Sequence, residues 1–331
     1  MLGVSLAILS IDFGGSHIAV AVVQETVVLA EAHMPTNSVS LAGNLDLVTA
    51  LIQSCILESG TKHPMLRGVA VGFCGIVDGE TGEILSVLNK YPDAHQVDLN
   101  AWAWREFKLP VRIENDACLA LLGEWLAGAA QDTKDVVMIT LGTGIGGAAM
   151  LGGKLLRSRA GQAGCLGGHL PVNFKGRLCS CGAVGCAEAE ASTAVLPFLC
   201  QEHPGFSTSS VANESVLNFN ALFRAVDAND DVAQDVLSHC IDVWSNLTVG
   251  LIHAYGPELV VFGGGVMQRG EQLLNPIRAY VEAHVWRTTR GLPRIERAQL
   301  GERAALLGGP ALFPKKRAAT GVSQRVHAKY V

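Results

Sequence analysis

Residues 109–125 read Leu-Pro-Val-Arg-Ile-Glu-Asn-Asp-Ala-Cys-Leu-Ala-Leu-Leu-Gly-Glu-Trp and change character in the middle. The first part, Leu109–Ile113, contains β-branched residues and a bounding proline, which is typical of a strand. The second part, Ala117–Trp125, carries apolar residues at helical spacing and good helix formers. The segment therefore predicts a strand that leads directly into a helix, with a Glu-Asn-Asp triplet at the junction.

The last residue of that triplet, Asp116, stands where a side chain can point into a cleft. Taken alone, it is better described as the N-cap of the helix, a position that Asp and Asn both favour. Two glycine-rich turns elsewhere in the chain shift the interpretation towards a functional carboxylate.

The chain has 331 residues, which is enough for two lobes with substantial cores. Hydrophobic residues make up 49% and charged residues 17%, a composition typical of a compact globular protein. The net charge is -5 and the pI about 6.1, so no strong basic field is present. This balance argues against nucleic acid as the main ligand.

The N-terminal apolar run, Val4–Ile11, is short and has no preceding Lys or Arg, so we expect no signal peptide. No apolar run reaches the roughly 20 residues that a membrane span needs. Nine cysteines without a secretion signal indicate a reducing cytoplasm. Clustered cysteines in that compartment more often bind metal or stay free than pair.

The first glycine-rich turn is Asp12-Phe13-Gly14-Gly15-Ser16, between the apolar runs Ala7–Ile11 and His17–Val23. This pattern predicts a β-hairpin. Its glycines let backbone N–H groups approach a ligand, its serine adds a hydroxyl, and its aspartate can hold Mg²⁺. An ordinary hairpin with a surface aspartate is the alternative.

The same theme returns in the second half of the chain, where the strand-like Asp135–Leu141 leads into the turn Gly142–Gly147 and the apolar run Ala148–Leu151. Only the pattern recurs, so the internal repeat is weak. Two such hairpins facing each other could hold an oligophosphate from both sides. The second turn does not match the G-x-x-x-x-G-K-[ST] phosphate loop.

A metal-binding pattern follows, with His169, Cys179, Cys181 and Cys186 spaced H-x9-C-x-C-x4-C. One histidine and three thiols form the ligand set of a closed, structural zinc site. Such a site would fix a polar loop and hold Glu188 rigidly beside it. The other six cysteines are scattered and are expected to fill cores.

The rest of the chain alternates predicted helices and strands. We expect helices at Leu45–Leu57, Leu99–Phe107, Glu190–Cys200, Asn220–Ala228, Val232–His253 and Ala304–Leu312, and strands at Gly68–Asp78 and Pro257–Phe262. Gly263–Gly265 either forms a wall against an adenosine or is only a tight connection. Trp102 and Trp104 are expected to pack rather than stack on a sugar, and residues 314–331 to form a disordered basic tail.

Together these motifs resemble the repressor/ORF/kinase (ROK) family of bacterial sugar kinases over roughly residues 8–313. The resemblance is carried by Asp12-Phe-Gly-Gly-Ser, Glu114-Asn-Asp-Ala, Leu141-Gly-Thr-Gly-Ile-Gly-Gly, Gly168-His, Cys179-x-Cys-Gly-x-x-Gly-Cys-x-Glu188 and Phe262-Gly-Gly-Gly-Val. It implies the actin-like, hexokinase-type α/β fold with two lobes. The N-terminal lobe would span residues 1–117 with a returning helix near 304–313, and the larger lobe residues 118–303.

The resemblance also implies roles for single residues. Asp116 would be the general base, and Asn115, His169, Glu188 and Asn89 would contact the sugar hydroxyls. The ATP and Mg²⁺ side would be formed by Asp12, Gly14, Gly15, Ser16, Gly142, Thr143, Gly144, Gly264 and Gly265. With an ordinary pKa, Asp116 would be ionised at neutral pH. Relatives are commonly dimers, so a homodimer is expected.

One departure from the family pattern concerns the acceptor. The family has Gly-Glu-x-Gly-His before the cysteine cluster, and its glutamate binds the sugar near the anomeric end. Here either Cys165 or Leu166 takes that place, so a carboxylate is missing. A hydroxyl without a charged partner could cost about 1.5–3 kcal/mol of binding. The first turn also has Ser16-His17 where Thr-Lys is common.

The leading hypothesis is therefore an ATP-dependent kinase for the C6 hydroxyl of a hexose, glucose or a close relative. N-acetylmannosamine, allose, fructose or a non-sugar alcohol are alternative acceptors. A sugar sensor without catalysis is the rival. A DNA-binding repressor is not expected, because the first turn begins at Asp12 and leaves no room for a preceding helix-turn-helix.

Overall fold

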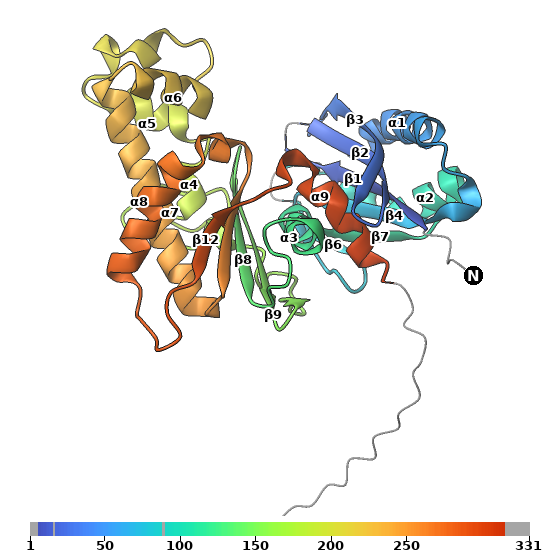
Figure 1. Cartoon of the computed structure of the whole chain (residues 1–331). Helices are drawn as coiled ribbons and strands as arrows, with labels where there is room; N and C mark the ends of the chain where they lie inside the picture. The colour runs from blue at the N-terminus through green and yellow to red at the C-terminus, as the bar shows by residue number, and fades with distance from the viewer. Residues whose placement is uncertain (1–5, 16, 88–89, 315–331) are drawn as a thin grey trace, which may run out of the picture.

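The computed structural model describes residues 6–15, 17–87 and 90–314, arranged around two five-stranded sheets (Figure 1). The predictions for Ser16, Asn89 and all but the first residue of the basic tail lie outside the described residues. The predicted α/β fold is confirmed.

The first sheet has the order β3-β2-β1-β4-β7. Its strands are β1 (Ala7–Phe13), β2 (His17–Gln24), β3 (Val27–Pro35), β4 (Leu66–Phe73) and β7 (Val111–Asn115). Strands β1 to β3 form an antiparallel meander, whereas β4 and β7 run parallel to β1. A small hairpin of β5 (Ile76–Val77) and β6 (Ile84–Ser86) follows β4.

Strands β1 and β2 of the first sheet are buried on both faces, which explains their nearly continuous apolar runs, whereas the edge strand β3 is partly exposed. One face packs in a core with α1 (Ala42–Ser59) and α2 (Leu99–Phe107). The other face contacts Leu306, Leu307 and Phe313 near the C-terminus. In Figure 1 the red α9 (Ala304–Gly308) accordingly lies beside the blue strands.

The second sheet repeats this arrangement with the order β10-β9-β8-β11-β12. Its strands are β8 (Val136–Leu141), β9 (Ile145–Leu151), β10 (Lys154–Leu155), β11 (Leu259–Gly263) and β12 (Arg294–Arg297). Again the first three are antiparallel and the last two are parallel to the first. The weak repeat in the sequence is therefore a repeat of topology.

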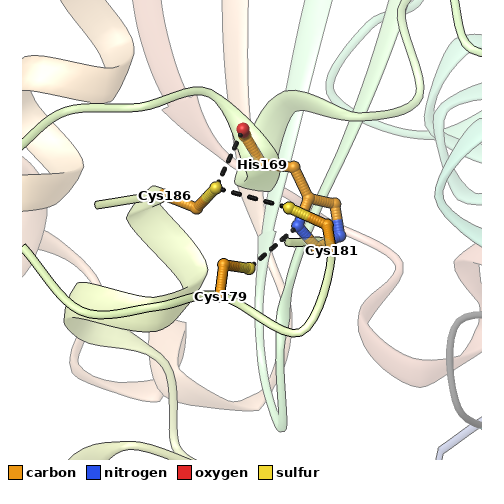
Figure 2. A group of neighbouring side chains, drawn as sticks. All are labelled: His169, Cys179, Cys181 and Cys186. Carbon is orange, nitrogen blue, oxygen red and sulfur yellow. Dashed lines mark hydrogen bonds between the residues drawn. The ribbon is translucent and has the colours of Figure 1, made fainter. Parts of the chain in front are cut away.

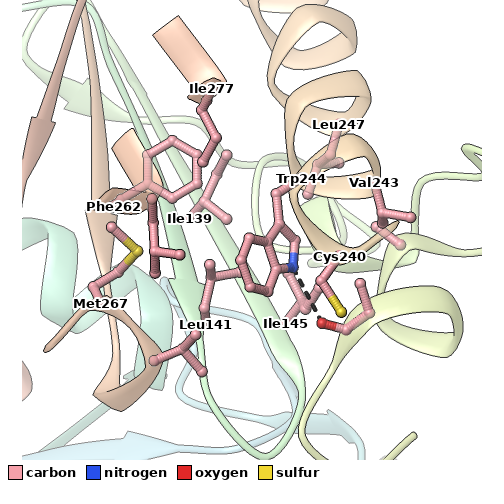
Figure 3. Close-up of a cluster of buried hydrophobic side chains, with 14 of the residues drawn as sticks. Ile139, Leu141, Ile145, Cys240, Val243, Trp244, Leu247, Phe262, Met267 and Ile277 are labelled. Carbon is pink, nitrogen blue, oxygen red and sulfur yellow. Dashed lines mark hydrogen bonds between the residues drawn. The ribbon is translucent and has the colours of Figure 1, made fainter. Parts of the chain in front are cut away.

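Five helices belong to the half of the chain with the second sheet: α4 (Ala187–Ala191), α5 (Leu196–Glu202), α6 (Phe219–Asp227), α7 (Asp231–Tyr255) and α8 (Glu271–His284). Figure 3 shows the core between them and the sheet, centred on the fully buried Trp244. Its indole Nε1 donates a 3.1 Å hydrogen bond to the carbonyl oxygen of Ala191. This bond satisfies the polar end of a side chain that otherwise packs among apolar groups.

The two sheets are joined by α3 (Asp116–Ala127) and α9, which cross at glycines. A Cβ added to Gly123 would lie 1.9 Å from the carbonyl oxygen of Ala304, and one added to Gly308 would lie 2.0 Å from that of Leu119. Neither distance leaves room for a side chain. Close backbone contact of these helices therefore fixes how the two halves of the molecule meet.

Two sequence-based expectations are corrected, and some elements were not predicted. The helix expected at Glu190–Cys200 is broken between α4 and α5, because the N–H groups of Thr193 and Ala194 bond to the carbonyls of the second glycine turn instead. Helix α8 and strand β12 were not expected. Trp102 is buried as predicted, but Trp104 is 60% exposed and does not pack in the core.

Among residues 6–15, 17–87 and 90–314, no helix is both long and apolar enough to cross a membrane.

Candidate active site

Two adjoining cavities, of about 800 and about 420 Å³, lie where the two glycine turns face each other. Both are lined by Asp116, Thr140, Gly142 and Thr143. The larger cavity also contains His169 and Glu188, and the smaller one Asp12. Asp116 thus stands between two spaces. The predicted sugar ligands Asn115, His169 and Glu188 line the larger one. The predicted nucleotide ligands are divided, since Asp12 and Gly265 line only the smaller cavity and Gly15 and Gly144 only the larger one.

The junction between β7 and α3 orients this carboxylate. Asn115 is the N-cap, since its side-chain oxygen accepts a hydrogen bond from the N–H of Cys118 at 3.1 Å. The interpretation of Asp116 as the cap is wrong, because it is the first residue of the helix itself. Its Oδ1 accepts bonds from the N–H of Ala117 at 2.9 Å and from Nδ2 of Asn115 at 3.0 Å.

Asn115 also donates to the carbonyl oxygen of Gly75 at 3.0 Å, so both amide protons are used within the protein. Its role here is to hold Asp116. Its amide nitrogen could donate to a bound hydroxyl only if one of these two hydrogen bonds were broken. The second oxygen of Asp116, Oδ2, has no hydrogen bond to any residue of the described ranges. It is the atom available for a proton.

The electrostatic surroundings of Asp116 differ from the expectation of an ordinary pKa. Burial raises the pKa of this carboxyl above its usual value. The rise is opposed by the Ala117 N–H, by the positive charge of Lys90 and by Asn115. A carboxylate with a raised pKa is closer to neutrality and better matched to accepting a proton from a hydroxyl near pH 7.

Asp12 occupies the end of β1 beside the first turn. Its Oδ1 is buried and has no hydrogen-bond partner among the described residues. Burial, and secondly the charge of Asp116, raises the pKa of Asp12 to about 8. An unpartnered carboxylate oxygen beside a cavity is the kind of ligand that Mg²⁺ prefers, so this residue fits a magnesium ion. Gly15 lines the larger cavity beside it.

The second turn is fixed from several sides. Thr193 and Ala194 donate to the carbonyls of Gly142 and Thr143, both at 3.1 Å. The N–H of Ile145 donates to Oε2 of Glu188 at 2.9 Å. The turn is therefore rigid before any ligand arrives.

Gly264, at the end of β11, closes the smaller cavity from the other side. Its φ is 87°, and an added Cβ would lie 2.2 Å from the carbonyl oxygen of Leu141. Only glycine fits there, for backbone conformation and for space. Gly264 and Gly265 both line the cavity, where we predicted that they would flank a nucleotide.

The predicted metal ligands gather as Figure 2 shows. The ligand atoms of His169, Cys179, Cys181 and Cys186 all lie within 4.8 Å of one another. Sγ of Cys181 is 3.6 Å from Sγ of Cys186, and Sγ of Cys179 is 3.4 Å from Nδ1 of His169. A tetrahedral zinc site gives about 3.8 Å between sulfurs and about 3.5 Å between sulfur and nitrogen, so these residues fit the ion.

Glu188 connects this cluster to the second glycine turn. While Oε2 holds the N–H of Ile145, Oε1 lies 4.0 Å from Nε2 of His169. Nδ1 of His169 faces the cysteines, and the other ring nitrogen, Nε2, faces the Glu188 carboxylate. In metal-bound histidines the nitrogen that does not bind the metal commonly donates to a carboxylate in this way. Both Glu188 and His169 line the larger cavity, in agreement with the sequence-based prediction of their neighbourhood.

The two residues that can take the place of the family's glutamate lie at the site. Cys165 and Leu166 both line the larger cavity, and the Cys165 thiol donates to the carbonyl oxygen of Gly161 at 3.2 Å. No acidic residue occurs between Gly164 and Gly168.

Sequence reasoning missed Lys90 and Thr140, which also line the larger cavity. Lys90 directly follows the predicted sugar ligand Asn89 in the sequence, and this adjacency could have pointed to it.

Comparison with known proteins agrees with this geometry. The sequence matches the ROK family over residues 8–316. It is 30% identical over 317 residues to a glucokinase of Thermotoga maritima, covering 94% of this chain and 98% of the relative. It is 28% identical to a putative xylose repressor of Caldicellulosiruptor over 276 residues, covering 81% of this chain and 67% of the relative.

Among solved structures, a ROK family glucokinase from Streptomyces griseus, in complex with glucose and AMPPNP, superimposes with a TM-score of 0.79 at 30% identity. The match covers 92% of this chain and 98% of that one. The chain belongs to the ROK family and has its actin-like ATPase fold.

Proposed function

We propose that this chain is an ATP-dependent sugar kinase that phosphorylates the C6 hydroxyl of a hexose, glucose or a close relative. The observation that carries the proposal is the position of Asp116 between the two cavities, with Oδ2 free. The similarity to glucokinases along nearly the whole chain supports it.

The larger cavity would hold the acceptor and the smaller one the nucleotide. The acceptor hydroxyl gives its proton to Oδ2 of Asp116, and its oxygen forms a bond to the γ-phosphorus. The bond from that phosphorus to the β–γ bridging oxygen breaks, and ADP leaves with the electron pair. General-base help of this kind contributes about 10²–10⁴-fold to the rate.

The residues around the nucleotide supply positioning and charge. Backbone groups of Gly142 and Thr143 would meet the phosphate oxygens, while Asp12 would hold Mg²⁺ directly or through water. When bound, Mg²⁺ neutralises charge on the phosphates. Because the pKa of Asp12 is raised to about 8, the protein would release protons when it takes up Mg·ATP near neutral pH.

We also propose that the His169 cluster binds one structural zinc ion per chain, held by Nδ1 of the histidine and the three thiols. The thiols would bind as thiolates, and the ion would fix the loop that carries them. Metal analysis of the purified protein should find about one zinc ion per chain, and Cys181→Ser should lower this zinc content.

Incubation with ATP, Mg²⁺ and a panel of hexoses and N-acetylhexosamines tests the main proposal, with ADP release as the readout. Asp116→Asn should lower kcat by about 10²–10⁴-fold while sugar still binds. Turnover by the variant at the wild-type rate would remove Asp116 from the base role.

A sugar sensor without catalysis is the second candidate, favoured by the missing carboxylate and by the repressor among the relatives. The same panel separates the two. If calorimetry detects sugar binding and no acceptor of the panel causes ADP release from ATP, the chain is a sensor. A homodimer and a cytoplasmic location stay predictions.

A further inference from the structure

Lys90 reaches into the active-site cavity at the first glycine turn. A Cβ added to Gly15 would lie only 2.1 Å from Nζ of Lys90, so the ammonium rests against the backbone of this turn. The side chain is half-buried and lines the larger cavity together with Gly15 and Asp116. It therefore sits between the phosphate turn and the proposed base.

The residue after Lys90 fixes this position. Tyr91 is fully buried and has a φ of 52°. Its ring packs edge-on against Phe13, and its N–H donates to the carbonyl oxygen of Ser38 at 2.7 Å. Its hydroxyl donates to the carbonyl oxygen of Gly14 at 3.2 Å. Tyr91 thus attaches the backbone of Lys90 to the same turn that the ammonium touches.

The charge of Lys90 is uncommitted. No carboxylate of the described ranges lies within ion-pair distance of Nζ, whereas Arg177, in the same cavity, is paired with Glu202 at 3.0 Å. The Lys90 ammonium nevertheless acts on Asp116 through its field. A half-buried cation without a partner, aimed at the place of reaction, is arranged for an anion that arrives with a ligand.

We propose that Lys90 is a catalytic residue whose ammonium contacts the transferring phosphoryl group and stabilises its charge as the group passes to the acceptor. The inference rests on the proposed kinase function and adds to it a cation on the acceptor side of the phosphate turn. The metaphosphate-like group carries its charge on three equatorial oxygens, and the lysine ammonium can donate a hydrogen bond to the oxygen that faces it.

The test compares Lys90→Met with Lys154→Met, which removes an exposed lysine on β10. Steady-state kinetics should show kcat lower by about 100-fold in Lys90→Met, the cost of one lost donor to a transition state, with acceptor KM nearly unchanged. Lys90→Arg should recover part of the rate, and Lys154→Met should match the wild type. A large rise in acceptor KM with unchanged kcat would overturn the proposal in favour of an anionic acceptor.

A binding measurement tests the role of Lys90 independently of turnover. Calorimetry with Mg·ADP, alone and with aluminium fluoride as a phosphoryl mimic, should show tighter binding with the mimic in the wild type. Lys90→Met should lose most of that gain and still bind Mg·ADP. Wild-type protein without turnover would refute the kinase but leave this comparison decisive. Equal gains in both proteins, or no gain in the wild type, would overturn the role of Lys90.

Discussion

The two glycine hairpins have the same frame and different chemistry. In each, the first strand pairs antiparallel with the second and parallel with a later strand of its sheet. At the last but one strand pair before the turn, Asp12 faces Ala19 in the first hairpin and Thr140 faces Gly146 in the second. An unpartnered carboxylate in one half therefore corresponds to a neutral hydroxyl in the other.

This difference shows how a repeated fold becomes an asymmetric site. The first hairpin carries charge, with Asp12 for a cation and Lys90 resting on its turn. The second carries backbone groups, held in place by Glu188 and by the segment after α4. The proposed metal-bound nucleotide needs both kinds of contact, and each half of the molecule would supply one of them.

Removing the Asp12 charge at the first hairpin should have the largest effect on kcat. Asp12→Asn should lower kcat by about 10³-fold, because the residue proposed to hold Mg²⁺ loses its charge. Thr140→Val, at the matching position, should lower it by no more than about 10-fold. The measurement is steady-state ADP release at saturating Mg²⁺. Equal losses in the two variants would break the assignment of charge to one side.

The crossing of α3 and α9 offers a comparison in stability. Gly123→Ala and Gly308→Ala should each destabilise by about 3 kcal/mol, since both methyl groups would meet a backbone carbonyl. Gly250→Ala is the control, an exposed position of α7 with open space, and should stabilise by roughly 0.5–1 kcal/mol. Urea unfolding measures all three. A mild effect at only one of the crossing glycines would show that the contact is one-sided.

The pH dependence of stability should give the smallest effect. Because the folded pKa of Asp12 is about 8 and its ordinary value 3.8, the folded state keeps a proton that the unfolded chain has lost between these values. Stability of the ligand-free protein should therefore fall as pH rises through this window, by at most about 1.4 kcal/mol per pH unit. Partial exposure of Asp12 reduces the slope.

Asp12→Asn should flatten that slope, whereas Thr140→Val should leave it unchanged. Thermal unfolding at a series of pH values without Mg²⁺ is the measurement. Stability of the wild type that increases from pH 5 to pH 8 would contradict the raised pKa of Asp12.

Much of the fold could be predicted because local patterns agreed with it. The β1–β2 and β8–β9 hairpins follow from apolar runs around glycine turns, and α2 has the bounds that its sequence indicates. The break between α4 and α5 could not be foreseen, since it depends on hydrogen bonds to Gly142 and Thr143. Helix propensity carries no information about such a distant partner.

The candidate site could likewise be predicted only in part. The four residues of the cysteine cluster were found from spacing, and the structure brings their ligand atoms together. The electrostatics could not be predicted, because the raised pKa of Asp116 results from burial by residues distant in sequence. Lys90 was missed since its reach to Gly15 depends on the buried anchor Tyr91.

The two-sided grip of Glu188 has a consequence for how the protein responds to metal supply. One oxygen holds the second turn at Ile145, and the other faces the imidazole of the cysteine cluster. Without the proposed zinc ion, His169 would be free to turn, and its displacement would pass through the Glu188 carboxylate to the second glycine turn. Removal of the proposed ion by a chelator would then lower turnover by the proposed kinase, and zinc added back would restore it.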